Sequence, residues 1–145
     1  MIRDITAADR AAFIGMVEKL YSSSAVDHAV DPSVFQTTFD TALSDSPYVR
    51  ALMIEDEGAP VGYAILSFTY ATEVGGLVVQ LEDLYICGSC RGKGLGSKFM
   101  SFMEAEYPQA KRFRLEVTKE NVKAKDLYAK LGFKVLEYVQ MVKGV

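Results

Sequence analysis

Glycine at every second position is the feature of this sequence that most restricts its fold. Gly92, Gly94 and Gly96 stand between a β-rich run, Leu77–Ile86, and an apolar-periodic segment that begins at Leu95. Glycines spaced in this way let main-chain N–H groups turn inward without obstruction from Cβ atoms. At the start of a helix such a loop makes an anion-binding nest, and the helix dipole adds about 0.3–1 kcal/mol for an anion there. The pattern predicts a strand, an anion-binding loop and a helix in succession.

The cations around this glycine loop (residues 91–97) strengthen the prediction of an anion-binding loop. The sequence of the loop does not match either of two common phosphate-binding motifs. Arg91, Lys93 and Lys98 add positive charge. Counted from Gly92, a Walker A motif needs its second glycine at position 97, where this chain has Ser97. The Rossmann glycine motif needs its last glycine at the same position. The plain alternative is a glycine-rich turn that only caps a helix.

Hydrophobic periodicity and capping residues predict the order of the remaining elements. We expect strands at residues 2–5, 48–54, 61–70, 77–86, 112–117 and 133–142. We expect helices from about residue 7 to 21, from 32 to 43, from 95 to 107 and from 122 to 131. Asn121 is a good N-cap for the last helix, and Gly132 suits the position after its end. Hairpins mixed with strand–helix–strand units predict an α/β domain with a mixed sheet.

Length and composition limit the class of protein. The chain has 145 residues, which predicts a single domain over residues 1–145. Two closely spaced cysteines, Cys87 and Cys90, and one histidine, His28, give neither a disulfide framework nor a zinc site. The N-terminus lacks the apolar core of a secretory signal, and no apolar run is long enough to span a membrane. These observations predict a reduced, cytoplasmic protein without a metal and without membrane association.

Charge is distributed unevenly along the chain. Residues 1–86 carry four Lys or Arg and thirteen Asp or Glu, whereas residues 87–145 carry twelve and six. The basic part is suited to an anionic ligand and the acidic part to a cation, although ordinary solvated surface charge is the plain alternative. The isoelectric point near 5.2 argues against bulk binding of nucleic acid.

Three segments together resemble the GNAT superfamily of acetyl-CoA-dependent N-acetyltransferases. The glycine loop fits that family's [Q/R]-x-x-G-x-[G/A] signature, Leu84–Ile86 precedes it, and Asn121-x-x-Ala124-x-x-x-Tyr128 follows. The element order matches from residue 2 to about 142. The resemblance implies the GNAT fold, a mixed and mostly antiparallel sheet of six to seven strands flanked by about four helices. It also implies acetyl-CoA as cosubstrate, no metal, and a homodimer, because many members of the family form dimers.

The resemblance assigns roles to residues of this chain. The strand end Leu84, Tyr85 and Ile86 would pair with the pantetheine arm of the coenzyme. Main-chain N–H groups of the glycine loop would hold the pyrophosphate, the residues being Arg91, Gly92, Lys93, Gly94, Leu95, Gly96 and Ser97. Asn121 and Ala124 would lie along the coenzyme. Tyr128 matches the position of the family's usual general acid.

The acids of the Leu81–Ile86 run most resemble the diamine (spermidine/spermine) acetyltransferase branch, in which the acid matching Glu82 serves the acceptor amine. A carboxylate is too weak a base to hold an ammonium proton without help. Glu82 is therefore predicted to end a water relay or to seat the cation. A plain solvent-facing acid is the alternative. Asp83 would face the opposite side of a regular strand, and it replaces Glu82 if a bulge redirects it.

Tyr128 also has two interpretations. A tyrosine is a weaker acid than an alkyl thiol, so donating a proton to a departing thiolate is uphill by only about 2 kcal/mol. Its helical spacing with Ala124 and Leu131 would equally suit a core tyrosine. Asn121 could act only as an N-cap, His28 is expected to be solvated, and Cys87 and Cys90 are expected to be packing residues.

These observations predict an N-acetyltransferase for a primary amine, with polyamines and other cationic small molecules as candidate acceptors. The first two helices and the turn at residues 70–76 are expected to shape the acceptor pocket. A non-catalytic acetyl-CoA-binding sensor or interaction domain on the same fold is the alternative, and a nucleotide binder of unrelated fold is a third.

Overall fold

The computed structural model describes residues 1–144, so the last residue of the predicted domain 1–145 lies outside the described residues. Five strands form one sheet in the order β1-β2-β3-β4-β5. They are β1 (Ile2–Asp4), β2 (Val49–Asp56), β3 (Ala59–Ala71), β4 (Gly76–Ile86) and β5 (Arg112–Leu115). The helices are α1 (Arg10–Tyr21), α2 (Pro32–Leu43), α3 (Leu95–Glu106) and α4 (Val122–Lys130). Neighbouring strands are antiparallel except β4 and β5, which are parallel.

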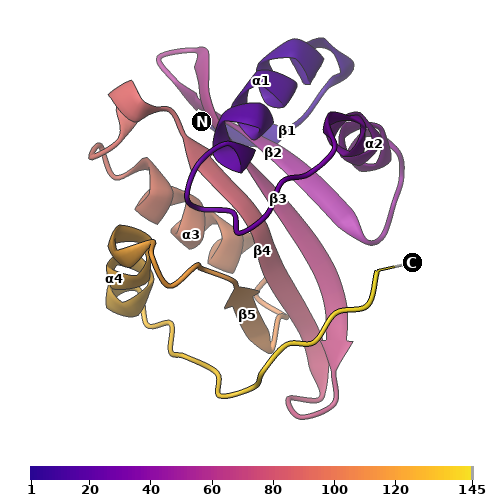
Figure 1. The fold of residues 1–145 in the computed structure, drawn as a ribbon, viewed down its shortest axis with the longest axis vertical. Coiled ribbons are helices and arrows are strands. Elements are labelled where there is room, and N and C mark those ends of the chain that lie inside the picture. Colours follow the sequence, from indigo (N-terminus) through magenta and orange to yellow (C-terminus); the bar gives the residue numbers. More distant parts are fainter. Residues whose placement is uncertain (145) are drawn as a thin grey trace.

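The helices cover both faces of this sheet (Figure 1). On one face α1 and α2 bury an aromatic cluster, in which the Phe13 ring lies 5.2 Å from Phe39 and 4.9 Å from Tyr63. On the other face α3 buries Phe99 and Met103 against the sheet. Because side chains alternate along a strand, β2 and β3 contribute to both clusters and are buried on both sides.

A β-bulge interrupts the pairing of β3 with β4. Leu66 lies opposite Leu81, and the next residue, Ile65, lies opposite Asp83. Glu82 is therefore the extra residue and has no partner on β3. A bulge of this kind redirects side chains and increases the local twist of the strand.

Strand β4 separates from β5 at the same place. The parallel pairing joins Val78–Leu81 to Arg112–Leu115 and then ends. Residues 82–86 of β4 therefore have no strand partner on this edge among residues 1–144. The main-chain groups that point away from β3 on this edge can pair with a ligand that runs alongside, as they would with another strand.

Most of the predicted elements are confirmed, with ends that shift by at most three residues. The first predicted helix begins later as an α-helix, because Ala7–Asp9 forms a short 3-10 helix ahead of it. Asp31 caps α2 by accepting a hydrogen bond from Ser33 N–H, and Asn121 caps α4 in the same way from Ala124 N–H. Gly132 has a φ of +92°, as expected after a helix end.

The predicted strand at residues 133–142 is wrong, and within residues 1–144 the sheet has five strands instead of six to seven. Alternating apolar residues favour a strand, but a strand forms only where a neighbouring edge supplies main-chain partners. Here the segment is extended beside β5 and is tied by side chains, Tyr138 to Glu73 at 3.1 Å and Gln140 to Glu116 at 2.8 Å. Apolar side chains such as Val139, which is 90% exposed, consequently stay in solvent.

No helix among residues 1–144 is both long enough and apolar enough to cross a membrane.

Candidate active site

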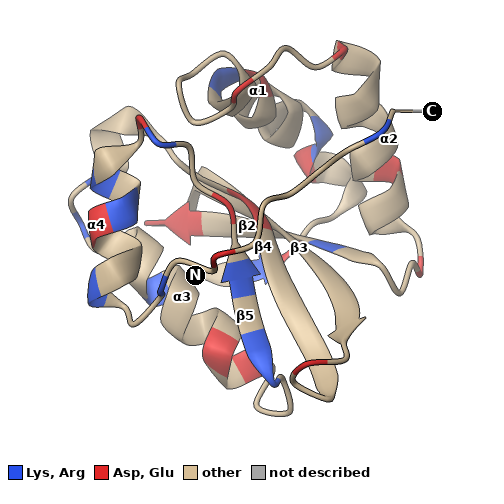
Figure 2. Ribbon diagram, turned by 60° about the horizontal axis from the view of Figure 1, so that its bottom comes forward, with Lys and Arg blue, Asp and Glu red and all other residues tan. Residues whose placement is uncertain are grey.

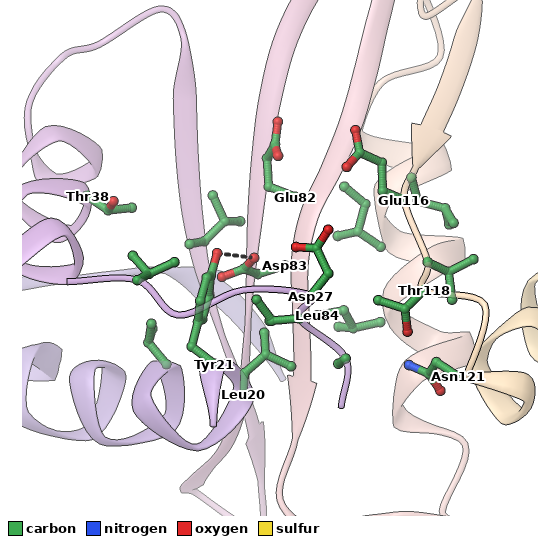
Figure 3. Close-up of a pocket in the computed structure, with 18 of the residues that line it drawn as sticks. Leu20, Tyr21, Asp27, Thr38, Glu82, Asp83, Leu84, Glu116, Thr118 and Asn121 are labelled. Atoms are coloured by element: carbon green, nitrogen blue, oxygen red, sulfur yellow. Dashed lines mark hydrogen bonds between the residues drawn. The ribbon is translucent and has the colours of Figure 1, made fainter. Parts of the chain in front are cut away.

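Two cavities meet where β4 separates from β5. The first, the acid cavity, has a volume of about 690 Å³ and lies between the α1–α2 side and the β4–β5 split (Figure 3). The second, the loop cavity, has a volume of about 630 Å³ and lies against the glycine loop and α4. Six residues line both cavities: Leu20, Ala25, Leu84, Asn121, Ala124 and Tyr128. The two cavities are thus adjacent and share a small set of side chains.

The segment between α1 and α2 covers this junction. Ala25 from that segment and Leu20 from the last turn of α1 contribute to both cavities. The Thr118 hydroxyl, which follows β5, donates a hydrogen bond to the Ser24 carbonyl at 3.1 Å. This contact joins two segments far apart in the sequence, and it encloses the place where the cavities meet.

The glycine loop presents unpaired main-chain donors to the loop cavity. The first hydrogen bond of α3 runs from Lys98 N–H to the Gly94 carbonyl at 2.9 Å, and within residues 1–144 the N–H groups of residues 92–97 donate no hydrogen bond. Gly92 and Gly94 have φ values of +81° and +77°, a backbone conformation that glycine adopts without steric cost. A helix start with several unpaired N–H groups attracts an anion.

A side chain on either glycine would disturb this arrangement. A Cβ atom built on Gly92 or Gly94 meets no atom of residues 1–144 within 4 Å, so the space beside each is open to a ligand. The positive φ angles would nevertheless strain any L side chain there. The loop therefore has both the space and the donors that a diphosphate needs.

Eleven of the twelve residues predicted to bind the coenzyme line the loop cavity, namely Leu84, Tyr85, Ile86, Arg91, Gly92, Gly94, Leu95, Gly96, Ser97, Asn121 and Ala124. Lys93 is the exception. Its ammonium group pairs with Asp56 at 3.2 Å, which ties the loop to the β2–β3 turn. Arg91 also faces β4, because its Nε donates a hydrogen bond to the Ile86 carbonyl at 3.0 Å.

The acid cavity carries strong negative charge. Four carboxylates line it, those of Asp27, Glu82, Asp83 and Glu116, and no Lys or Arg among residues 1–144 does so. Three of these acids lie on different segments of the chain, in the α1–α2 loop, in β4 and after β5 (Figure 3). Lys and Arg are instead found on β5 and α4 (Figure 2). A pocket of this composition favours a cationic ligand.

Asp83 is buried at the floor of the acid cavity between two tyrosines. It accepts hydrogen bonds from Tyr63 Oη at 2.9 Å and from Tyr21 Oη at 3.1 Å. Burial raises the pKa of Asp83, although the two tyrosine hydrogen bonds oppose this effect. Burial, followed by the charge of Asp83, also raises the pKa values of Tyr63 and Tyr21, so both phenols stay protonated donors.

Glu82 lies beside Asp83 and lines the same cavity, which agrees with the alternative in which a bulge interrupts the strand. The bulge at Glu82 breaks the alternation that separates consecutive side chains in a regular strand. Glu82 is exposed, and its carboxylate accepts a hydrogen bond from the Ser67 hydroxyl at 2.5 Å. One acid is thus fixed by tyrosines, and the other is accessible from the cavity.

Tyr128 stands at the junction, on α4. It lines both cavities, and its ring packs against Phe133 with 5.9 Å between centroids. Burial raises the pKa of Tyr128, so the phenol remains protonated near neutral pH. A protonated phenol reached from both cavities can donate a proton to a group that leaves between them.

Several residues of the site were not predicted from the sequence. Tyr21 and Tyr63, which hold Asp83, come from α1 and β3, and neither belongs to a motif. Asp27 and Glu116 join the acid cavity only because the fold brings their loops together. The turn at residues 70–76, expected to shape the acceptor pocket, lines neither cavity. Tyr21 and Tyr63 had no signal in the sequence, and Asp27 had only the acidic bias of residues 1–86.

His28, the histidine of the α1–α2 loop, lines the acid cavity with a side chain that is 73% exposed and paired with Asp27. Within residues 1–144 no three His, Cys, Asp or Glu side chains are grouped so that they could hold a metal ion.

The comparisons with known proteins identify the family. A model of the acetyltransferase (GNAT) family matches residues 15–133. Thialysine N-ε-acetyltransferase of Mus musculus is 32% identical over 142 residues, which cover 90% of this chain and 82% of that protein. The Sus scrofa protein of the same name is 32% identical over 143 residues, covering 91% and 82%. The chain therefore belongs to the acetyltransferase (GNAT) family and is an acetyltransferase, as the sequence motifs predicted.

Solved structures show the same fold. A possible acetyltransferase from Clostridium difficile 630 superimposes with a TM-score of 0.83 at 17% identity, covering 100% of this chain and 97% of that one. AAC(6')-Iy in complex with the bisubstrate analogue CoA-S-monomethyl-acetylneamine superimposes with a TM-score of 0.81 at 16% identity, with the same coverage. The predicted α/β fold class is therefore confirmed, with the strand count corrected above.

Proposed function

We propose that this acetyltransferase moves an acetyl group from acetyl-CoA to a primary amine of a cationic small molecule, with polyamines as the leading candidates. The observation that carries the proposal is the position of Tyr128, where the loop cavity and the acid cavity meet. One cavity offers unpaired N–H groups and the other offers carboxylates, so an anionic donor and a cationic acceptor would approach the same phenol from opposite sides.

The residues of the loop cavity fit acetyl-CoA. Unpaired N–H groups of residues 92–97 suit the pyrophosphate, and the unpaired edge of β4 from Glu82 to Ile86 suits the amide groups of a pantetheine arm. The coenzyme supplies an activated thioester. Relatives by fold support this assignment, since the AAC(6')-Iy structures contain CoA or a CoA conjugate.

The acid cavity would bind the acceptor and help it lose a proton. An alkylammonium with a pKa of about 10.4 is neutral in only about one molecule in 2,500 at pH 7. The carboxylates of the cavity favour the cation and hold it near the junction. Glu82, being accessible, is the candidate to pass the amine proton to solvent through water, and the buried Asp83 is the candidate to seat the cation.

Tyr128 would act as the general acid for the departing thiolate. In solution the transfer from a phenol to a thiolate is uphill by about 2 kcal/mol. Burial raises the pKa of Tyr128, and the same surroundings would raise that of the thiol, because both anions lose solvation. The difference between the two pKa values therefore stays small enough for a catalysed step.

We also predict a homodimer and a cytoplasmic location for this protein.

An acetyl-transfer screen tests this proposal. The full chain is incubated with acetyl-CoA and polyamines, amino acids, aminoglycosides or peptide N-termini, and release of free CoA thiol is measured at low and high salt. We expect the highest kcat/KM for polyamines and a loss of this preference as salt increases. Coenzyme binding without turnover on any amine would favour the non-catalytic acetyl-CoA-binding domain instead. Absence of coenzyme binding would contradict both.

A further inference from the structure

Two cysteines occupy one turn immediately before the glycine loop, in the sequence Cys87-Gly88-Ser89-Cys90, and the acetyl transfer described above does not use them. They are the only cysteines of the chain, and both are free and partly exposed. Gly88–Cys90 forms a short 3-10 helix, in which Cys90 N–H donates to the Cys87 carbonyl at 3.0 Å. The residues are therefore first and fourth of a tight turn.

This turn holds the two cysteines at a separation compatible with a disulfide. The ends of a hydrogen-bonded four-residue turn lie within about 7 Å of each other at Cα, and disulfides join Cα atoms about 4.4–6.8 Å apart. The Ser89 hydroxyl lies 3.5 Å from Cys87 Sγ and 3.8 Å from Cys90 Sγ, so both thiols are near the same small group. A disulfide would therefore join two sulfurs that already lie in one turn.

The pKa values of the two thiols shift in opposite directions. The Cys90 thiol, together with the Ser89 hydroxyl, lowers the pKa of Cys87, and the positive charge of Lys93 acts in the same direction. The same contact with Cys87 raises the pKa of Cys90. Cys87 is thus suited to attack a disulfide, since the thiolate is the nucleophile, and Cys90 is suited to resolve the product.

The turn is also connected to the loop cavity. Cys87 is fixed to β3, because its N–H donates to the Val61 carbonyl at 2.8 Å. Cys90 lines the loop cavity and directly precedes Arg91, whose side chain holds the Ile86 carbonyl. A bond of about 2 Å between the sulfurs would draw Cys90 toward the fixed Cys87. The start of the glycine loop would move with it.

We propose that Cys87 and Cys90 form a reversible thiol–disulfide site, and that closing the disulfide weakens binding of the coenzyme. The second part rests on the proposed function, because it takes the loop cavity as the coenzyme site. The oxidant is a low-molecular-weight disulfide, for which oxidised glutathione is the probe.

The reaction balances in two exchanges. The Cys87 thiolate attacks one sulfur of oxidised glutathione, forming a mixed disulfide and releasing one glutathione thiolate. Cys90 loses its proton to solvent and attacks the Cys87 sulfur, which releases the second glutathione thiolate. Two protein thiols are oxidised to one disulfide, and one glutathione disulfide is reduced to two thiols.

The first experiment measures disulfide formation without any coenzyme. The full chain is equilibrated in mixtures of reduced and oxidised glutathione, quenched with acid, alkylated and weighed by mass spectrometry. The expected product has lost two hydrogens and carries neither glutathione nor alkyl group. The variants Cys87→Ser and Cys90→Ser should stop at a glutathione adduct. A stable adduct on the unaltered chain, or two thiols that remain free, would overturn the proposal.

The second experiment measures the Kd of the reduced and oxidised chain for acetyl-CoA, which has no free thiol to reduce the disulfide. We expect affinity to fall by about fivefold or more on oxidation, the lower end of ordinary coupling between sites. Because linkage is reciprocal, saturating acetyl-CoA should shift the dithiol toward its reduced form by the same factor.

The thiol-free variant Cys87→Ser/Cys90→Ser is the matched control and should bind acetyl-CoA equally before and after exposure to oxidised glutathione. Equal affinities of the reduced and oxidised unaltered chain would refute the regulatory role while leaving the proposed function in place. A reduced chain that does not bind acetyl-CoA would refute the proposed function as well, and the mass measurement would still report the disulfide.

Discussion

The loop cavity and the acid cavity are built in opposite ways, although they share one wall. The loop cavity relies on main-chain groups of one continuous segment, the glycine loop, and on the free edge of β4. The acid cavity relies on side chains from the α1–α2 loop, β4 and the segment after β5. The first therefore depends on backbone conformation, and the second depends on tertiary packing.

This difference suits a family in which the anion-binding site is shared and the amine-binding site varies. A main-chain site needs only small residues and a helix start, so many sequences can provide it and each will bind the same anion. A side-chain site changes with every substitution around it, so the same fold can accept different amines. Tyr128 belongs to both cavities, and a substitution there is the strongest test of the comparison.

Tyr128→Phe should have the largest effect. If the phenol donates a proton where the cavities meet, its removal should lower kcat by about 10²–10⁴ and leave the Kd for CoA nearly unchanged. Steady-state kinetics and calorimetry on the same preparation measure both. Tyr138→Phe is the matched control, because Tyr138 is exposed and bonds only Glu73. Full activity of Tyr128→Phe would remove this residue as the acid.

Glu82→Gln should have the second-largest effect, and it should change the reaction with the amine without changing binding of the coenzyme. We expect kcat/KM for a polyamine to fall by about 10² near neutral pH, and by more at lower pH, where less of the amine is neutral. A pH profile from 6 to 9 compared with that of the unaltered chain gives the result. A loss of the same size at every pH would instead assign Glu82 to binding or structure. The Kd for CoA should stay constant.

Gly94→Val should affect only the loop cavity. A β-branched residue at a φ of +77° is strained by about 1–3 kcal/mol, so the loop should abandon the inward orientation of its N–H groups. We expect the Kd for CoA to rise by about 5- to 100-fold. Gly75→Val, at a φ of +66° in the β3–β4 turn, is the matched control. It should lose stability and keep coenzyme affinity, whereas unchanged affinity in Gly94→Val would contradict the anion nest.

Glu116→Gln should have the smallest effect. It removes one of four carboxylates of the acid cavity, so the KM for a dicationic amine should rise by roughly two- to fivefold at low salt. The difference should shrink as salt screens the remaining charges. Kinetics with a diamine and with a neutral amine of similar size give the comparison. An equal change for both amines would mean that Glu116 acts through packing.

More residues of the loop cavity than of the acid cavity could be predicted from the sequence, because the loop cavity is built from local motifs and the acid cavity from tertiary packing. The glycine loop, Asn121 and Tyr128 lie at fixed spacings along the chain, so eleven residues that line the loop cavity could be named before the structure. The ion pair between Lys93 and Asp56 could not be predicted, because the two residues are distant in sequence. Tyr21 and Tyr63 could not be found, since only the folded sheet brings them to Asp83.

The fold was predicted well where the periodicity reflects local preference and poorly where it depends on a partner. Helices with clear caps, such as α2 after Asp31 and α4 after Asn121, begin where expected. The alternating segment at residues 133–142 has the composition of a strand, but no main-chain partner pairs with it in residues 1–144. Composition indicates a preference for extended backbone, but it does not show whether an edge strand of the sheet is placed to pair with the segment.

The bulge in β4 means that Glu82 could be deleted without changing the register between β3 and β4. Because Leu81 and Asp83 already sit opposite adjacent residues of β3, loss of one codon would leave an unbroken ladder, with every later residue of the strand still oriented as before. An ancestor of this chain could therefore have gained or lost an acid in the acceptor pocket by a single insertion or deletion, without rebuilding the sheet around it.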